Sequence, residues 1–281
     1  MDRLPIIEKL VGILLKELPS VAGEAARFQT DELAQRALLR GLMNMHNPQK
    51  LLSEEYFKLQ DMLLQDELKE KTITDCRLLA PVKKHDLMRH FNGDITCLKV
   101  DAIVNSASNN LLGCFVAAHN CVDNCIHSAA GLQLRFFCQD LIIKQGSPER
   151  PGEAKITPGF NLPCPYVIHT IGPSIAWQVN SGNEETLRKC YLSCLKLADE
   201  KGLKSIAFPC ISTGDSRFPH SQAGRIAVET VYKYLNETKS SLKVVFVTKT
   251  EVDKNIYEKL LNPDPAAKPE DLHPFFNVNL F

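Results

Sequence analysis

Apolar residues recur at helical spacing in the first part of the chain, up to about residue 72. Pro19 and Pro48 divide the repeat into runs. Residues three and four apart share one face of a helix, so each run predicts an amphipathic helix whose apolar face needs a partner. The runs comprise Ile6, Ile7, Leu10, Ile13 and Leu14, then Leu33, Ala37, Leu38 and Leu42, and last Tyr56, Leu59, Leu63 and Leu64. We predict a helical N-terminal extension over residues 1–84 that packs on the main domain, with a separate binding function as the alternative.

From residue 85 the pattern changes to short apolar segments that alternate with longer amphipathic ones. The short segments, which predict strands, are residues 86–91, 102–105, 154–157, 166–171, 205–209 and 243–248. The longer segments, which predict helices, are residues 123–139, 184–201, 219–236 and 253–261. This alternation is typical of an α/β fold, in which a mixed, mainly parallel sheet lies between helices. We predict one such domain over residues 85–262, followed by a proline-containing C-terminal tail over residues 263–281.

The composition excludes some classes of partner. The chain has 33 Lys and Arg residues and 33 Asp and Glu residues, so no net positive field attracts a nucleic acid or an anionic membrane. No segment approaches the length of a membrane span, and the N-terminus lacks the pattern of a secretory signal. The 10 cysteines are scattered through apolar positions, which is typical of reduced thiols. These features predict a cytoplasmic protein that binds neither nucleic acid nor membrane.

Polar residues follow several predicted strands, at the sheet edge where α/β domains bind ligands. Asp94 follows the first strand, where an ordinary turn residue is the alternative to a ligand contact. Asn105 ends the second strand, where a buried amide that bonds the turn is the alternative. Residues 210–219 join a strand to a helix that we expect to begin at Pro219, and their small side chains allow main-chain N–H groups to face an anion. Each segment alone is a weak signal.

Together and in this order, the strand-end segments resemble those of the macrodomain family, in its ADP-ribosyl-hydrolase branch. The segments are Gly93–Thr96, Val100–Asn105, Leu111–Gly113, Val122–Gly131, Gly152–Thr157, Tyr166–Pro173 and Phe208–Gly214. The resemblance covers about residues 85–262. It implies a three-layer macrodomain that binds ADP-ribose and hydrolyses it from modified proteins. The zinc-dependent microbial branch is similar in also having a helical extension.

The resemblance implies a role for each candidate residue. Asp94, with the Ile95 main chain beside it, would bind the adenine amino group. Asn105 would bond hydroxyls of the distal ribose, the sugar attached to the modified protein. Asp123 would orient or deprotonate the attacking water, although capping of the following helix is the alternative for this residue alone. The diphosphate would be wrapped by the main chain of a loop comprising Ser212, Thr213, Gly214, Asp215, Ser216, Arg217 and Phe218.

Residues 114–121, here called the metal loop, replace a short glycine-rich link of the ordinary hydrolase pattern. With the spacing of Cys114, His119 and Cys121, one flexible loop can place two thiolates and an imidazole around a zinc ion. From the spacing alone, two buried thiols beside an exposed histidine are the alternative. The loop resembles that of the zinc-dependent macrodomains, which implies that all three residues bind Zn²⁺ beside the distal ribose. Three protein ligands leave one position open, as in catalytic zinc sites.

The sequence also departs from the family pattern. Ser108 stands where many hydrolases have a second asparagine, and Ser216 and Arg217 replace an aromatic residue and a glycine of the loop that would wrap the diphosphate. Contacts to the distal ribose are therefore expected to differ, and Arg217 either pairs with a phosphate or faces solvent. His127 and His169 lie in apolar surroundings and are expected to be structural.

These observations predict a zinc-dependent hydrolase that removes single ADP-ribose groups from proteins, with an ester linkage at Asp or Glu favoured. Zinc would anchor the distal ribose and polarise an oxygen while Asp123 positions water. The resemblance implies an ADP-ribosylated protein as substrate, such as a lipoyl carrier protein modified by a sirtuin-like transferase, and ADP-ribose as product. The alternatives are an ADP-ribose reader with a structural zinc ion and an O-acetyl-ADP-ribose deacetylase.

Overall fold

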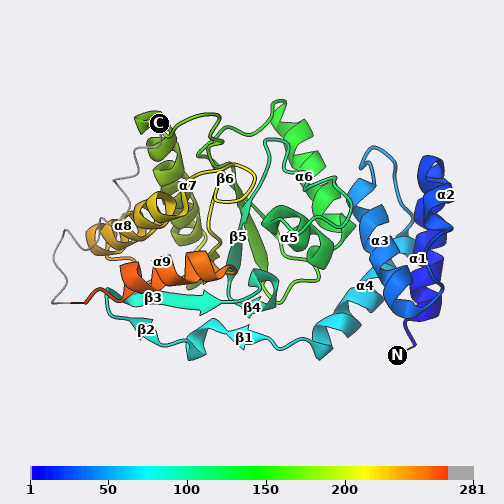
Figure 1. Ribbon diagram of the computed structural model, residues 1–281, viewed down its shortest axis with the longest axis horizontal. Coiled ribbons are helices and arrows are strands. Elements are labelled where there is room, and N and C mark those ends of the chain that lie inside the picture. The colour runs from blue at the N-terminus through cyan, green and yellow to red at the C-terminus, as the bar shows by residue number, and fades with distance from the viewer. Residues whose placement is uncertain (1, 265–281) are drawn as a thin grey trace, which may run out of the picture.

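The computed structural model describes residues 2–264 and contains a central sheet with helices on both faces (Figure 1). The strands of this sheet are β2 (Pro81–Val82), β3 (His85–Asn92), β5 (Ala102–Ser106), β6 (Ala154–Pro158), β7 (Tyr166–Thr170), β8 (Ser205–Phe208) and β9 (Lys243–Thr248). Their order is β2-β3-β9-β8-β5-β7-β6. Only the two edge pairs, β2 with β3 and β6 with β7, are antiparallel among these strands. The predicted mixed, mainly parallel sheet is confirmed.

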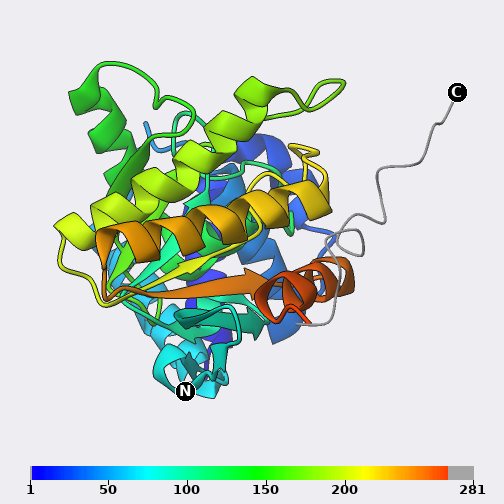
Figure 2. The ribbon, with the colours of Figure 1, turned by 90° about the vertical axis from the view of Figure 1, so that its left-hand side faces the viewer.

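The helices bury both faces of the sheet. One face is covered by α7 (Ser181–Glu200), α8 (His220–Thr238) and α9 (Glu251–Leu261), which lie in front of the sheet in Figure 2. The other face is covered by α5 (Val122–Ala130) and α6 (Leu132–Gln145). In β8, Ile206 and Phe208 pack towards the first group of helices, whereas Ala207 packs towards the second. Strands buried on both faces are apolar at successive positions, which is why they read as short apolar runs.

The N-terminal extension is helical and packs on α6. It contains α1 (Leu4–Glu17), α2 (Ala22–Ala25), α3 (Glu32–Met45) and α4 (Glu54–Glu70). Asp31 caps α3 by accepting a hydrogen bond from the Ala34 N–H, and Ser53 caps α4 in the same way. The apolar faces of these helices form one cluster that also includes Leu132 and Phe136 of α6. The extension and the α/β domain therefore share a hydrophobic contact.

The structure differs from the predicted elements in three places. The helix predicted over residues 123–139 is two helices, since Gly131 lies between α5 and α6 with φ of 94°. Pro219 is the N-cap of α8 rather than its first residue. The sequence pattern also missed β2 and a separate two-stranded sheet of β1 (Thr74–Asp75) and β4 (Leu98–Lys99), because two residues are too few to show a period.

Two further predictions concern the C-terminal tail and membrane-spanning segments. The predicted tail over residues 263–281 lies, after residue 264, outside the described residues. Between residues 2 and 264, no helix combines the length and apolarity needed to cross a membrane.

Candidate functional site

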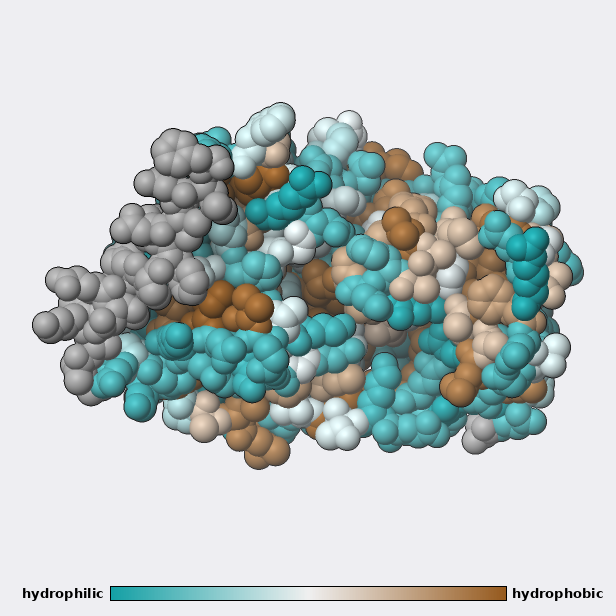
Figure 3. All heavy atoms as spheres, in the orientation of Figure 1, coloured by the Kyte–Doolittle hydropathy of each residue, from teal (hydrophilic) through white to brown (hydrophobic). Residues whose placement is uncertain are grey.

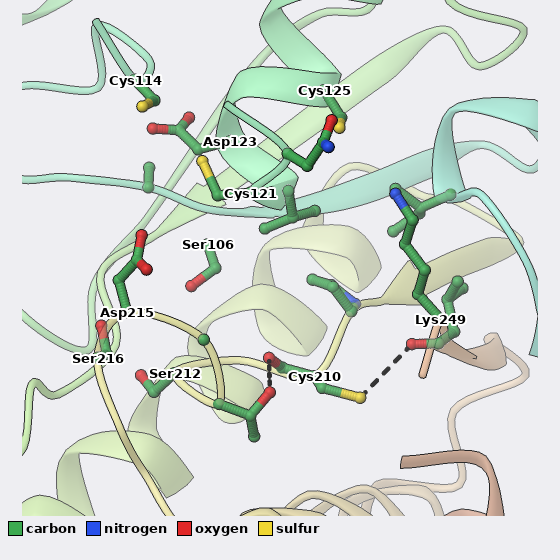
Figure 4. Close-up of a pocket in the computed structure, with 18 of the residues that line it drawn as sticks. Ser106, Cys114, Cys121, Asp123, Cys125, Cys210, Ser212, Asp215, Ser216 and Lys249 are labelled. Carbon is green, nitrogen blue, oxygen red and sulfur yellow. Dashed lines mark hydrogen bonds between the residues drawn. The ribbon is translucent and has the colours of Figure 1, made fainter. Parts of the chain in front are cut away.

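A cavity of about 540 Å³ lies where the parallel strands end. Its walls come from the loops after β3, β5, β8 and β9 and from the start of α5. Figure 3 shows the surface hollowed near the middle of this face, and Figure 4 shows side chains that line the cavity. The predicted site residues in its lining are Asp94, Ile95, Cys114, Cys121, Asp123, Ser212, Thr213, Gly214, Asp215 and Ser216. The sheet edge that the sequence indicated therefore holds a cavity.

Asp94 lies in the turn after β3. One carboxylate oxygen accepts hydrogen bonds from the Thr96 N–H at 2.9 Å and from the Thr96 hydroxyl at 2.8 Å. This is the ordinary turn role that the sequence left open. Asp94 also lines the cavity together with Ile95. The two interpretations are therefore compatible, because one oxygen holds the turn and the carboxylate has a second.

The loop over residues 210–219, here called the diphosphate loop, has fewer free donors than the sequence implied. The Arg217 N–H donates to the Gly214 carbonyl at 2.8 Å, and the Phe218 N–H donates to the Ser212 carbonyl at 2.9 Å. The Phe218 side chain is buried in the core and Arg217 is exposed, and neither lines the cavity. Within the described part of the chain, the N–H groups of Ser212 and of residues 214–216, all in the cavity lining, have no hydrogen-bond acceptor. These four N–H groups are the candidates for binding an anion.

Asn105 does not lie in the cavity wall. Its side chain is fully buried, with 0% of its surface exposed, and its amide nitrogen donates to an oxygen of Asp123 at 2.7 Å. The same nitrogen lies 3.2 Å from Nδ1 of His169. The adjacent residue Ser106 lines the cavity instead, because successive side chains of a strand point to opposite faces. Asn105 therefore lies behind the predicted site and contacts Asp123.

Asp123 lies in the first turn of α5 and combines burial with access to the cavity. Burial raises the pKa of its carboxyl to about 6, against the opposing effects of the Asn105 hydrogen bond and the nearby Arg135 charge. Nε2 of His127, one turn further along the helix, lies 3.5 Å from the same carboxylate oxygen that Asn105 contacts. Burial lowers the pKa of His127 well below its ordinary value, so this histidine is neutral. Two buried carboxylates, Asp123 and Asp253, line the cavity, and Asp123 is the one that lies beside the metal loop.

His169 is expected to make the protein less stable in acid. Burial lowers its pKa to about 3, and its Nε2 donates to the Thr157 hydroxyl at 2.9 Å while Nδ1 accepts from Asn105. Because the unfolded histidine has a pKa of about 6.5, the unfolded chain takes up a proton that the folded chain cannot. Stability is thus fully present above about pH 6.5 and is lost as the pH falls towards 3. Between pH 7.5 and pH 5, the free energy of unfolding should drop more for the wild type than for His169→Gln. Equal drops would contradict this assignment.

Cys114, His119 and Cys121 come together beside Asp123, and one ligand atom from each lies within 4.8 Å of the others. The Cys114 Sγ lies 3.6 Å from the His119 Nδ1. Zinc bonds of about 2.3 Å to sulfur and 2.0–2.1 Å to nitrogen, at a tetrahedral angle, place these atoms about 3.6 Å apart. The donor set and its spacing therefore fit a zinc ion. In Figure 4, the two cysteines and Asp123 lie at one end of the cavity and Lys249 lies at the other.

The cavity lining includes residues that sequence reasoning missed. Lys249 and Asp253 follow β9, and Cys125 lies one turn after Cys121 on α5. The position of Lys249 directly after a predicted parallel strand is a signal that would have found it. Cys125 gives no comparable signal, since a cysteine on a buried helix face is usually part of the core. Lys249 adds a cation at the end of the cavity opposite the metal loop.

Comparisons with known proteins agree with this architecture. The sequence model of the family described as Macro domain matches residues 104–227. A protein-ADP-ribose hydrolase of Staphylococcus aureus (strain MRSA252) is 49% identical over 228 residues, which cover 81% of this chain and 85% of that protein. A protein-ADP-ribose hydrolase of Treponema medium is 45% identical over 255 residues, which cover 90% and 97%. The structure of a Trypanosoma brucei macrodomain in complex with ADP-ribose is 31% identical with a TM-score of 0.60, and the match covers 75% of this chain and 91% of that chain. The chain therefore belongs to the macrodomain family.

Proposed function

We propose that this protein is a hydrolase that removes single ADP-ribose groups from modified proteins. The observation that carries the proposal is the position of Asp123, a buried carboxylate at the cavity wall beside the Cys114, His119 and Cys121 cluster. The names of the Staphylococcus aureus and Treponema medium relatives, both protein-ADP-ribose hydrolases, support it. A reader, which binds ADP-ribose without cleaving it, needs the cavity but does not need a buried carboxylate beside the bond to be cleaved.

ADP-ribose would lie along the cavity with its adenine at Asp94 and its distal ribose at the metal loop. The Asp94 carboxylate accepts the hydrogen bond of the adenine amino group, and the N–H groups of Ser212 and of residues 214–216 face the diphosphate. Main-chain N–H groups suit a diphosphate because they provide fixed partial positive charges without a side chain to order. Lys249 adds a positive charge to the lining. The ligand's anionic centre is thus bound without a basic patch on the protein.

Asp123 would position the attacking water and accept its proton. Asn105 holds the carboxylate in place through the 2.7 Å hydrogen bond to one oxygen, which leaves the other oxygen for water. Cys114, His119 and Cys121 would hold zinc, which when bound acts as a Lewis acid towards an oxygen of the distal ribose. Ser106 and Ser108 line the cavity in this region and supply hydroxyl groups to the ribose. Binding, orientation and proton transfer are therefore assigned to separate groups.

The linkage that we favour is an ester of ADP-ribose with Asp or Glu of the target. The experiment is to incubate the zinc-loaded protein with proteins modified through defined Asp, Glu, Ser or Arg linkages, and to follow released ADP-ribose by mass spectrometry. A lipoyl carrier protein modified by a sirtuin-like transferase belongs among these substrates. Release from the ester substrates supports the proposal. Stable binding without release from any substrate would establish a reader, and turnover of only free O-acetyl-ADP-ribose would establish a deacetylase.

Asp94→Asn is expected to weaken ADP-ribose binding by about 10-fold or more, since a hydrogen bond to a charged group contributes about 1.5–3 kcal/mol. Asparagine keeps an oxygen for the Thr96 N–H, so the turn after β3 is preserved. Its NH₂ group then faces the amino group of adenine, donor against donor. Isothermal titration with ADP-ribose and with inosine diphosphate ribose, whose base has a carbonyl at this position, measures the effect. The variant should gain relative preference for the inosine ligand, and an unchanged preference would place adenine elsewhere.

A further inference from the structure

The metal loop has little backbone structure of its own. Among residues 114–121, the one main-chain hydrogen bond that closes within the described loop runs from the His119 N–H to the Val116 carbonyl, at 3.2 Å. Ala118 has φ of 53°, a left-handed conformation that is unfavourable for a residue with a side chain. Such a segment needs contacts from outside to keep one shape. Cys114 and Cys121, two of the three proposed zinc ligands, lie at its two ends.

Asn124 of α5 supplies one outside contact, since its Nδ2 donates to the Val116 carbonyl at 3.0 Å, and helix α3 of the N-terminal extension supplies two more. Nη2 of Arg40 donates to the His119 carbonyl at 2.9 Å and to Oδ1 of Asn124 at 3.1 Å. One turn further along α3, Oδ1 of Asn44 accepts the Ala118 N–H at 3.0 Å. Asn44 is buried, and its Nδ2 donates to the Ser128 hydroxyl of α5 at 3.0 Å. The strained residue and the metal-ligating histidine are thus both held by the extension.

The end of α3 is itself fixed to the α/β domain through Arg135 of α6. This arginine is 1% exposed, and its Nη1 donates to the carbonyls of Met43, Asn44 and His46 at 3.1, 2.8 and 2.8 Å. These carbonyls lie at the C-terminal end of α3, where the helix no longer supplies the N–H donors of its interior, and the Met43 carbonyl also accepts the His46 N–H at 3.4 Å. The Arg135 guanidinium also lies 4.4 Å from the ring centre of Phe115 in the metal loop. Helix α3, the metal loop and α6 therefore form one contact network.

We propose that α3 is a part of the metal site, in which Arg40 and Asn44 are positioning residues that preorganise the metal loop. This inference rests on the proposed zinc site. A loop already held in its binding shape loses less conformational entropy when the ion binds, so affinity is higher than for a free loop. The function of the extension is then to shape the end of the cavity at which the metal loop lies.

The test compares Arg40→Met with Arg36→Met. Both changes keep the apolar stem and remove the charged donor, and Arg36 lies one turn earlier on α3, where its Nη2 donates to Glu67 of α4 at 3.0 Å, within the extension. Competition with a chromophoric chelator measures zinc affinity, and titration of the zinc-free proteins measures ADP-ribose affinity. Arg40→Met should bind zinc about 10- to 100-fold more weakly than the wild type, the usual effect of losing a group that supports metal ligands. Arg36→Met should stay near the wild type.

The possible results separate the two levels of the proposal. Wild-type zinc affinity in Arg40→Met, or an equal loss in both variants, would overturn the role of α3. A wild-type protein that binds no zinc would overturn the metal site and this inference together. If Arg40→Met does not fold, Asn44→Ala is the second variant, because it leaves Arg40 in place and removes the acceptor of the Ala118 N–H together with the hydrogen bond to Ser128.

Discussion

Asp123→Asn is expected to slow ADP-ribose release by about 10²- to 10⁴-fold, the usual contribution of a positioned general base. Asparagine has nearly the same shape, and its oxygen can still accept the hydrogen bond from Asn105. What is lost is the negative charge and the ability to accept a proton. The measurement is a single-turnover assay with a singly ADP-ribosylated protein at saturating enzyme. ADP-ribose affinity, measured by titration, should change by less than about 3-fold, because the residues proposed to bind adenine and the diphosphate lie elsewhere in the cavity lining.

Asp123→Glu is the matched control for the charge. It keeps the carboxylate and moves it by one methylene group, so release should be faster than in Asp123→Asn and slower than in the wild type. Asp140→Asn, at an exposed position on α6, removes a negative charge without touching the cavity and should behave as the wild type. Release by Asp123→Asn within about 2-fold of the wild-type rate would show that Asp123 is a helix-terminal residue without a catalytic role.

Much of the fold was predictable because its core strands are buried on both faces. Such strands read as continuous apolar runs, and the long amphipathic segments between them read as helices. The division of the first of these helices was not predictable, since α5 and α6 follow each other directly and a glycine inside an apolar pattern does not by itself indicate a break. The same limit applies to β1 and β4, which pair without any period of their own.

The candidate site was predictable to the level of its segments but not to the level of side-chain direction. Asn105 and Ser106 stand at the same strand end, and only the register of β5 in the sheet decides that Ser106 faces the cavity while Asn105 faces Asp123. The hydrogen bonds inside the diphosphate loop decide which of its main-chain N–H groups are free to bind a ligand. The spacing of residues in the sequence does not reveal these bonds. The contact of Arg40 with His119 joins residues 79 positions apart, and so it has no local pattern.

Cys121→Ser is expected to remove the bound metal and to slow ADP-ribose release by about 100-fold or more, on the scale of losing one preorganised electrostatic group. The Cys121 Sγ is also the N-cap of α5, where it accepts the Asn124 N–H at 3.4 Å. Serine is among the preferred N-cap residues, so this change should keep α5 and Asp123 in place. A substitution to alanine would remove the cap and the metal ligand at once. Metal content by mass spectrometry and single-turnover release measure the two effects on the same sample.

Cys125→Ser is the matched control, because Cys125 lies one turn later, lines the same cavity and is outside the three-residue cluster. Nη2 of Arg40 lies 3.9 Å from the Cys125 Sγ, and the serine hydroxyl keeps an acceptor for it. Cys125→Ser should keep one zinc ion per chain and the wild-type rate. Loss of zinc with full retention of release in Cys121→Ser would assign the metal a structural role and leave the chemistry to Asp123. Loss of both, with ADP-ribose affinity retained, would mean that the ion acts on the reacting end of the ligand. The two outcomes can be told apart because the proposed contacts of the diphosphate loop and Asp94 are to parts of the ligand away from the metal loop.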